Sequence, residues 1–322
     1  MKYILKRMGA AIATLLVVSI VVFTMFKIIP GDVVTTKLGV DATPERAEAL
    51  REKYGLNDPA YIQYINWLIG IVSGNLGMSY SKDIPVSEMI GDNLVVTLSL
   101  AIISLIMIIV IAVPLGLFTG YIGSKKNRGS EVFDGIFVGV NQVFMAVPSF
   151  FIGILISYFF GLILRWFSPG RYVSYRTDMI SFLLYLIPAA VAVAIPKIAM
   201  LTRFVKTAVK EEMYKDYVRT ARAKGVSETL VLVHHVFKNS IITSITALSV
   251  IIAEIFAGSV VVEQVFNLPG LGRLLVSSIG TRDYTVVMSI VMYIAIVIVM
   301  VNLLVDIVYR LVDPRIGGNG NE

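Results

Sequence analysis

The chain has 322 residues, of which 57% are hydrophobic and 16% are charged, and its mean hydropathy is +0.81. Soluble globular proteins carry about a quarter charged residues, so this composition excludes a freely soluble cytosolic enzyme and indicates a protein solvated by a bilayer. The net charge of +6 fits basic cytoplasmic loops better than nucleic-acid binding, and the absence of cysteine excludes disulfides, thiol catalysis and cysteine-ligated metals.

Six apolar stretches are long enough to cross a bilayer, which takes about 20 mostly apolar residues. They cover residues 10–29, 94–118, 133–163, 180–202, 240–262 and 284–308. The first follows basic residues as a signal peptide does, but its apolar run is long and lacks a small-x-small cleavage site, so we expect a retained helix. The sequence therefore predicts an all-α integral membrane protein with six transmembrane helices, forming a single transmembrane domain over residues 1–322.

Basic residues are concentrated in alternate segments between these stretches. With the N-terminus inside, the inner segments contain Lys2, Lys6, Arg7, Lys125, Lys126, Arg128, residues 203–238, Arg310 and Arg315. Residues 203–238 contain eight basic and four acidic residues, whereas the outer segment 31–93 contains five basic and nine acidic residues. Because cytoplasmic loops carry the excess of lysine and arginine, we expect both termini in the cytoplasm.

The outer segment 31–93 is predicted to contain two helices. Thr43-Pro44-Glu45 favours a helix start, since threonine caps, proline fits the first turn and glutamate meets the helix dipole. A second helix is expected from Asp58-Pro59. Its apolar residues, which suggest that it lies on the bilayer surface or on the helix bundle, are Tyr61, Ile65, Trp67 and Leu68.

The inner segment 203–238 is predicted to form a short helix, a tight turn and a second short helix. The first helix has an apolar stripe at helical spacing, made of Tyr214, Tyr217, Val218 and Ala221. Gly225 fits the position just after a helix, where the backbone takes a positive φ, and Ser227 can cap a second helix running through Leu230 and Leu232.

Two interpretations of this segment follow from its charge. It can be a surface helix held by anionic lipid. It can instead be a docking element, in which Ala221 and Ala223 allow close approach to a partner. Its charged contacts would then come from Arg219, Arg222 and Lys224.

Residues 216–225, which read D-Y-V-R-T-A-R-A-K-G, resemble the coupling-helix ("EAA") loop of ABC importer permeases, in the form seen in the dipeptide/oligopeptide/nickel family. Further similar segments, in family order, are Pro30-Gly31-Asp32, Tyr54-Gly55-Leu56 with Pro59, residues 74–79, residues 261–266, residues 269–273 and Asp313-Pro314-Arg315-Ile316. The Pro30-Gly31-Asp32 motif and the long outer segment resemble the first of the two permease subunits. One departure is Lys238, where the general pattern often has proline.

The resemblance implies a type I importer fold and an assembly of several subunits. The partners would be a second homologous permease, two ATP-binding subunits and an extracytoplasmic solute-binding protein, within the lipid of a bacterial or archaeal cytoplasmic (inner) membrane. Coupling to the ATPases is expected at Asp216, Tyr217, Arg219, Ala221, Arg222, Ala223 and Gly225. The chain itself has no G-x-x-x-x-G-K-[ST] phosphate loop, so it is expected to be a non-catalytic subunit without a bound cofactor, while ATP and Mg bind the partner ATPases. Peptides are the commonest cargo of such permeases, and nickel, metal chelates and oligosaccharides are the others.

Several residues within the spans could line the translocation path. Glu254 could receive a substrate's ammonium group, or could be protonated or paired structurally. The other pathway candidates are Asn141, Gln142 and Pro148, which put polar groups and a weakened backbone in the third span. Lys197 and Asp306 are expected to reach the interface at cytoplasmic span ends.

The connection between the last two spans is a candidate outer gate. A turn is predicted at Leu268-Pro269-Gly270, with proline fixing φ and glycine taking a positive φ, and the apolar residues 271–279 are expected to lie across the outer mouth. The gate candidates are Glu263, Pro269 and Gly270. GxxxG spacing at Gly116–Gly120 and Gly135–Gly139 predicts close helix packing. No metal site is expected, since His234 and His235 stand alone in a basic loop.

The alternative function is an ion-coupled secondary transporter. Such carriers more often show related half-repeats and several buried titratable groups, which this sequence lacks.

Overall fold

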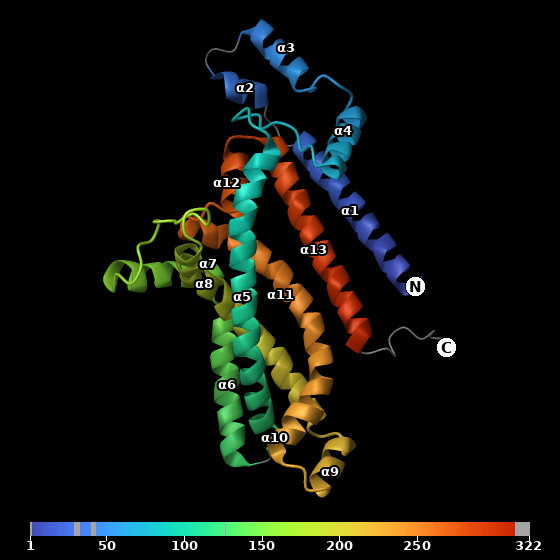
Figure 1. The fold of residues 1–322 in the computed structure, drawn as a ribbon, viewed down its shortest axis with the longest axis vertical. Helices are drawn as coiled ribbons and strands as arrows, with labels where there is room; N and C mark the ends of the chain where they lie inside the picture. The colour runs from blue at the N-terminus through green and yellow to red at the C-terminus, as the bar shows by residue number, and fades with distance from the viewer. Residues whose placement is uncertain (1, 29–32, 40–42, 126, 313–322) are drawn as a thin grey trace. The chain divides into compact units, whose positions relative to one another are not determined.

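The computed structural model describes residues 2–28, 33–39, 43–125 and 127–312, and within them the secondary structure is helical apart from one isolated β-bridge between Met78 and Pro85. Five helices are long and apolar enough to cross a membrane, and a bent pair brings the count to six if it forms one span. The five lie in α1 (Lys2–Ile28), α5 (Val86–Gly123), α8 (Met179–Glu212), α11 (Phe237–Val265) and α13 (Tyr284–Val312), which Figure 1 shows in chain order. The prediction of an all-α membrane protein is confirmed.

The third predicted span is not one straight helix. It is divided into α6 (Arg128–Ala146) and α7 (Ser149–Ile156), the latter continued by a π-helical segment η2 (Ser157–Ile163), and the two parts are bent by 89°. Pro148 stands at the break, preceded by Val147 in an extended conformation. The residue before a proline disfavours helical φ and ψ, which explains why the helix ends here.

The chain separates into two compact units, of which the first comprises Met1–Thr97 and Pro269–Met300. The short helices of this unit are α2 (Val33–Leu38), α3 (Pro44–Lys53), α4 (Ala60–Ser73) and α12 (Leu271–Gly280). Thr43 caps α3, its hydroxyl accepting from the Arg46 amide, and Pro59 precedes α4. The two helices predicted within residues 31–93 are therefore confirmed as helices. The motif Pro30-Gly31-Asp32 lies outside the described residues.

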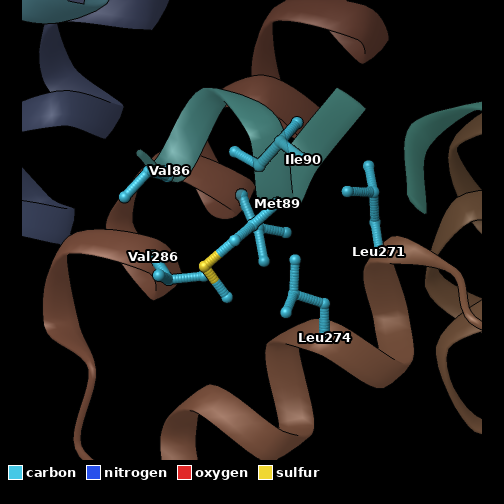
Figure 2. Packing of buried hydrophobic residues seen from close by; sticks show 7 residues of the cluster. Val86, Met89, Ile90, Leu271, Leu274 and Val286 are labelled. Carbon is cyan, nitrogen blue, oxygen red and sulfur yellow. The ribbon is translucent and has the colours of Figure 1, made fainter. Parts of the chain in front are cut away.

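The core of the first unit joins the start of α5, α12 and the start of α13. Its buried side chains, which Figure 2 shows converging from these three helices, are Val86, Met89, Ile90, Leu271, Leu274, Val286 and Ile290. The Leu271 amide also donates to the Thr97 hydroxyl over 2.8 Å. Of the apolar residues that follow Pro269-Gly270, Leu271 and Leu274 are thus packed inside this unit, whereas Val276 and Ile279 are exposed.

The second unit comprises Leu98–Leu268 and Val301–Glu322, and α8 packs in it against α6, α7 and α11. Close packing at the first GxxxG pair is confirmed, because a Cβ added at Gly116 would lie 2.5 Å from the Val205 Cβ and one at Gly120 would lie 2.8 Å from the Val209 Cβ. A Cβ at Gly135 or Gly139 would meet nothing within 4 Å, so this second pair has no packing partner among the described residues. The motif at 313–316 is outside the described residues, and the single domain over 1–322 stays a prediction.

The inner segment forms α9 (Asp216–Ala223), α10 (Glu228–Leu230) and a π-helical segment η3 (Val231–Val236). The expectation of a separate second helix is wrong, since α10 runs through η3 directly into α11. Ser227 stands at the predicted cap position, but its side chain makes no capping hydrogen bond. As Figure 1 shows, α9 therefore lies at the base of one long helical path, residues 228–265.

Candidate functional site

The end of α9 is a tight turn built on glycine. Gly225 has φ +78°, as predicted for the position after the helix. Its amide donates to the Arg222 carbonyl over 2.9 Å, and the Val226 amide donates to the Ala221 carbonyl over 3.2 Å. This pair of bonds is the Schellman arrangement, which satisfies the last helix carbonyls and reverses the chain.

One side of α9 is buried against the chain's own helices. Val218 is fully buried and Ala221 is 8% exposed. The helix packs against η3, in which Val231 and Val236 are fully buried. Of the two small residues expected to approach a partner, Ala221 therefore faces this chain's interior, whereas Ala223 is exposed.

A bidentate ion pair between Arg222 and Glu228 spans the turn. The Arg222 Nε donates to Glu228 Oε1 over 2.8 Å, and its Nη2 donates to Oε2 over 3.1 Å. An exposed pair of this kind stabilises a protein by at most about 1 kcal/mol, but its planar geometry restricts orientation. The pair thus links α9 to the start of the helical path at Glu228.

Tyr217 joins α9 to the end of α8. Its hydroxyl donates to Glu212 Oε2 over 2.6 Å. Burial and the neighbouring Glu212 carboxylate raise the pKa of Tyr217 to about 12, so the phenol stays protonated and remains a donor. Through Tyr217 and the Arg222–Glu228 pair, α9 is tied to both α8 and α11.

The other side of α9 is open and charged. Its exposed residues are Asp216, Arg219, Thr220, Arg222, Ala223 and Lys224. The side chain of Arg219 is 79% exposed and that of Asp216 is 98% exposed. We refer to these six residues as the α9 outer face.

Glu254 forms an ion pair with Lys197 of α8. The expectation that Lys197 reaches the interface at a span end is therefore wrong, because its ammonium is directed at the carboxylate on the neighbouring helix. The sequence placed these residues in different spans without indicating that the spans are adjacent. The pairing removes the need for a polar group from another subunit to balance Glu254.

The other pathway candidates have different surroundings. The Asn141 amide donates to the Ala199 carbonyl over 2.9 Å and so ties α6 to α8. Gln142 is exposed, and Pro148 stands at the bend between α6 and α7. Asn141 thus positions two helices, while Gln142 is directed outward from this chain.

The turn after α11 differs from the prediction in which residue takes the positive φ. Gly270 has φ −101°, an ordinary extended value, and the residue with positive φ is Asn267, at +56°. Asparagine tolerates this conformation because its short polar side chain bonds locally. Glu263 is fully buried, and its carbonyl accepts from the Leu268 amide over 2.8 Å, so it belongs to this helix end.

Asp283 is a functional candidate that the sequence did not reveal. Its buried carboxylate accepts from the hydroxyls of Ser79 and Ser81 over 2.5 and 2.7 Å and from the amides of Tyr80 and Ser81 over 3.1 and 3.0 Å. It thereby anchors the outer segment to the start of α13. An aspartate just before a helix is a recognisable capping signal, but its partners lie some 200 residues away in the chain.

Among the residues that the structure describes, no group of three or more histidine or acidic side chains is arranged to hold a metal ion. The described chain is therefore a helical membrane protein whose notable polar features are the anchored short helix α9 and an ion pair between spans. The structure thus defines the class of multi-pass helical membrane proteins.

Residues 112–318 match the family described as the inner membrane component of binding-protein-dependent transport systems, and residues 1–101 match the N-terminal family of such membrane components. The chain belongs to this family. It is 37% identical over 321 residues to an oligopeptide transport system permease protein of Bacillus subtilis, with 98% of each chain covered. It is 32% identical over 316 residues to a glutathione transport system permease protein of Salmonella typhimurium, covering 98% of this chain and 99% of the relative. A putative peptide transport system permease protein of Brucella abortus is 37% identical over 313 residues, covering 97% and 98%.

The predicted resemblance to ABC importer permeases is confirmed. The chain is a multi-pass inner-membrane permease of binding-protein-dependent ABC transport and a non-catalytic subunit of it. Membership in such a system implies ATPase and binding-protein partners. The ion-coupled secondary transporter is a different class and is set aside.

Proposed function

We propose that this permease transports peptides and forms the translocation path together with a second homologous permease. The three relatives described above are permeases for peptides, oligopeptides or glutathione, all of which contain peptide bonds. Two ATP-binding subunits on the inner side and an extracytoplasmic solute-binding protein on the outer side complete the proposed assembly.

The observation that carries the coupling proposal is the division of α9 into an anchored side and an open side. Val218 and Ala221 fix the helix to its own chain, while the α9 outer face is available for a partner. An ATPase that moves this face therefore moves a rigid unit rather than a loop. The proposed coupling residues are those of the segment 216–225: Asp216, Tyr217, Arg219, Ala221, Arg222, Ala223 and Gly225.

Two contacts of α9 connect it to helices that contain predicted membrane spans. Tyr217 contacts the end of α8 through Glu212, and Arg222 contacts Glu228 at the start of the path into α11. Because α8 and α11 carry Lys197 and Glu254, displacement of α9 by ATPase closure displaces the two helices that hold the ion pair. This is how ATP hydrolysis on partner subunits would act on the path.

The proposed topology has both termini in the cytoplasm and counts the bent pair of α6 and α7 as one span. The basic excess in residues 203–238 supports this orientation. The outer segment and the end of α11, with Glu263, Pro269 and Gly270, then lie on the extracytoplasmic side, where the solute-binding protein delivers its cargo.

The test is reconstitution of the full complex in proteoliposomes, with its binding protein outside and ATP at the ATPase subunits. We expect uptake of a labelled peptide that requires both ATP and the binding protein and continues after ion gradients are collapsed. A matched sample with a proton or sodium gradient but no ATP is the control. Gradient-driven uptake without ATP, or ATP-driven uptake of nickel or an oligosaccharide without any peptide uptake, would contradict the proposal.

A further inference from the structure

The Lys197–Glu254 ion pair lies deep within two neighbouring spans. Glu254 is ten residues after the start and eleven before the end of the apolar stretch Ser244–Val265, or about 15 Å from either end. Lys197 projects toward it from α8, which packs along α11. Charges at such a depth are costly in hydrocarbon and face a cavity, a water-filled path or another protein.

The part of the chain that the structure describes does not enclose the pair. The side chain of Glu254 is 40% exposed and that of Lys197 is 19% exposed. On the same side of α11, Val250 one turn before and Val261 two turns after are 49% and 46% exposed. Glu254 therefore stands on an open, otherwise apolar strip of the helix. An ion on such a strip would be unfavourable against lipid, which argues that the strip faces the translocation path.

An ion pair in such a position can exchange partners. The Coulomb attraction gained between two charges in a low-dielectric site is largely offset by their desolvation, so the pair itself stabilises little. A substrate carrying both an ammonium and a carboxylate can replace the one internal pair with two pairs to the protein. Lysine has a flexible four-carbon stem, which lets its ammonium turn from Glu254 to a substrate carboxylate.

We propose that Lys197 and Glu254 form an exchangeable subsite for a zwitterionic substrate, in which Glu254 receives the ammonium group and Lys197 receives the carboxylate. The subsite rests on the proposed function as a peptide permease and deepens it, since a peptide with free termini has both groups. The path is then electrically neutral when empty, because the two side chains pair, and neutral again when it holds the zwitterion.

The same electrostatics selects against substrates with one charged end. A peptide with a blocked amine brings only a carboxylate, and it leaves Glu254 without a counter-charge when it takes Lys197. A peptide with a blocked carboxyl group leaves Lys197 without one. An uncompensated charge in a poorly solvated site is strongly unfavourable, so both blocked peptides should cross more slowly than the free peptide.

The experiment measures uptake of three forms of one peptide by the complete transporter in proteoliposomes, with saturating binding protein. The forms have free termini, an acetylated amine or an amidated carboxyl group. We expect the wild type to favour the free peptide. Glu254→Gln leaves one positive charge and should favour the acetylated peptide, whereas Lys197→Met leaves one negative charge and should favour the amidated peptide. Each preference should shift by about tenfold relative to the wild type, the effect of one charge-assisted hydrogen bond.

Two further variants separate this role from a structural one. The exchange Lys197→Glu with Glu254→Lys keeps a neutral pair and should retain the wild-type order of the three peptides. Lys210→Met, which removes a cation of α8 that pairs with Asp134 instead, is the matched control and should also retain it. ATPase activity stimulated by the binding protein reports that each complex is assembled.

The outcomes are distinguishable. If Glu254→Gln and Lys197→Met scale uptake of all three peptides by one common factor, the pair is structural and the subsite is refuted. If the wild type takes up none of the peptides with ATP, the proposed peptide function is refuted and the subsite with it. Opposite preferences of the two single variants are the result that supports the subsite.

Discussion

Replacing Gly225 by valine should uncouple ATP hydrolysis from transport without preventing folding. Gly225 has φ +78°, and a Cβ added there would meet nothing within 4 Å, so the substitution causes backbone strain and no steric clash. A residue with a Cβ costs about 1–2 kcal/mol in this left-handed conformation, and a β-branched residue fits it especially poorly. A strain of that size lowers the equilibrium constant that favours the native turn over other local conformations about 5–30-fold.

The matched variant is Gly225→Asn, because asparagine tolerates the left-handed conformation. In proteoliposomes that contain the full complex, we expect Gly225→Val to lower peptide uptake per ATP hydrolysed by up to about fivefold, the lower end of that change in the equilibrium constant. Gly225→Asn should stay close to the wild type, and the amount of complex in the membrane should be the same for all three. Equal coupling ratios for the valine and asparagine variants would refute the role of the turn.

Three further predictions concern other parts of the structure. Gly116→Leu should destabilise the purified complex by about 1–3 kcal/mol, since its Cβ would lie 2.5 Å from the Val205 Cβ. Gly135→Leu, whose Cβ would have no atom within 4 Å, should leave the stability unchanged. Equal melting temperatures of the two variants would contradict the close packing of α5 on α8. Asp283→Asn should destabilise the outer segment by about 1–3 kcal/mol and speed amide hydrogen exchange at residues 79–81, because buried donors lose an acceptor. Asp83→Asn, at an exposed position, should cost at most about 1 kcal/mol. Unaltered hydrogen exchange in Asp283→Asn would count against the anchoring role of Asp283. The pKa of Tyr217 is raised to about 12 from an ordinary value near 10, so the folded chain holds this proton more tightly than the unfolded chain does. The stability that this proton contributes to the folded state is complete below about pH 10 and is lost toward pH 12. The melting temperature should therefore fall more steeply with pH across that window for the wild type than for Tyr217→Phe, and equal slopes would refute the prediction.

Local features of this protein could be read from its sequence because they depend on neighbouring residues. The cap at Thr43, the start of α4 after Pro59 and the positive φ of Gly225 each follow from the conformational preferences of one or two residues. The apolar stretches revealed the spans for the same reason, since the bilayer sets their length. The break at Pro148 was visible as a weakened backbone, but its 89° angle was not.

Long-range partners could not be predicted. Lys197 and Glu254 are 57 residues apart, and Asp283 bonds to Ser79 across 204 residues, distances over which a single sequence gives no pairing information. The burial of Ala221 was also hidden, because the helical pattern shows which residues share a side of α9 but not which side meets the chain's own η3. The continuity of α10 with α11 was missed because Ser227 looks like a cap that starts a separate helix.

The most direct test of the coupling proposal uses the absence of cysteine from this chain. A thiol introduced by Arg219→Cys, on the α9 outer face, can carry a thiol-reactive photocrosslinker in the assembled transporter, and Lys82→Cys in the outer segment provides a control of equal chemistry. We predict that the probe at residue 219 crosslinks to an ATP-binding subunit and that the probe at residue 82 does not. An assembled, ATP-hydrolysing complex in which residue 219 crosslinks to no ATP-binding subunit would contradict the account.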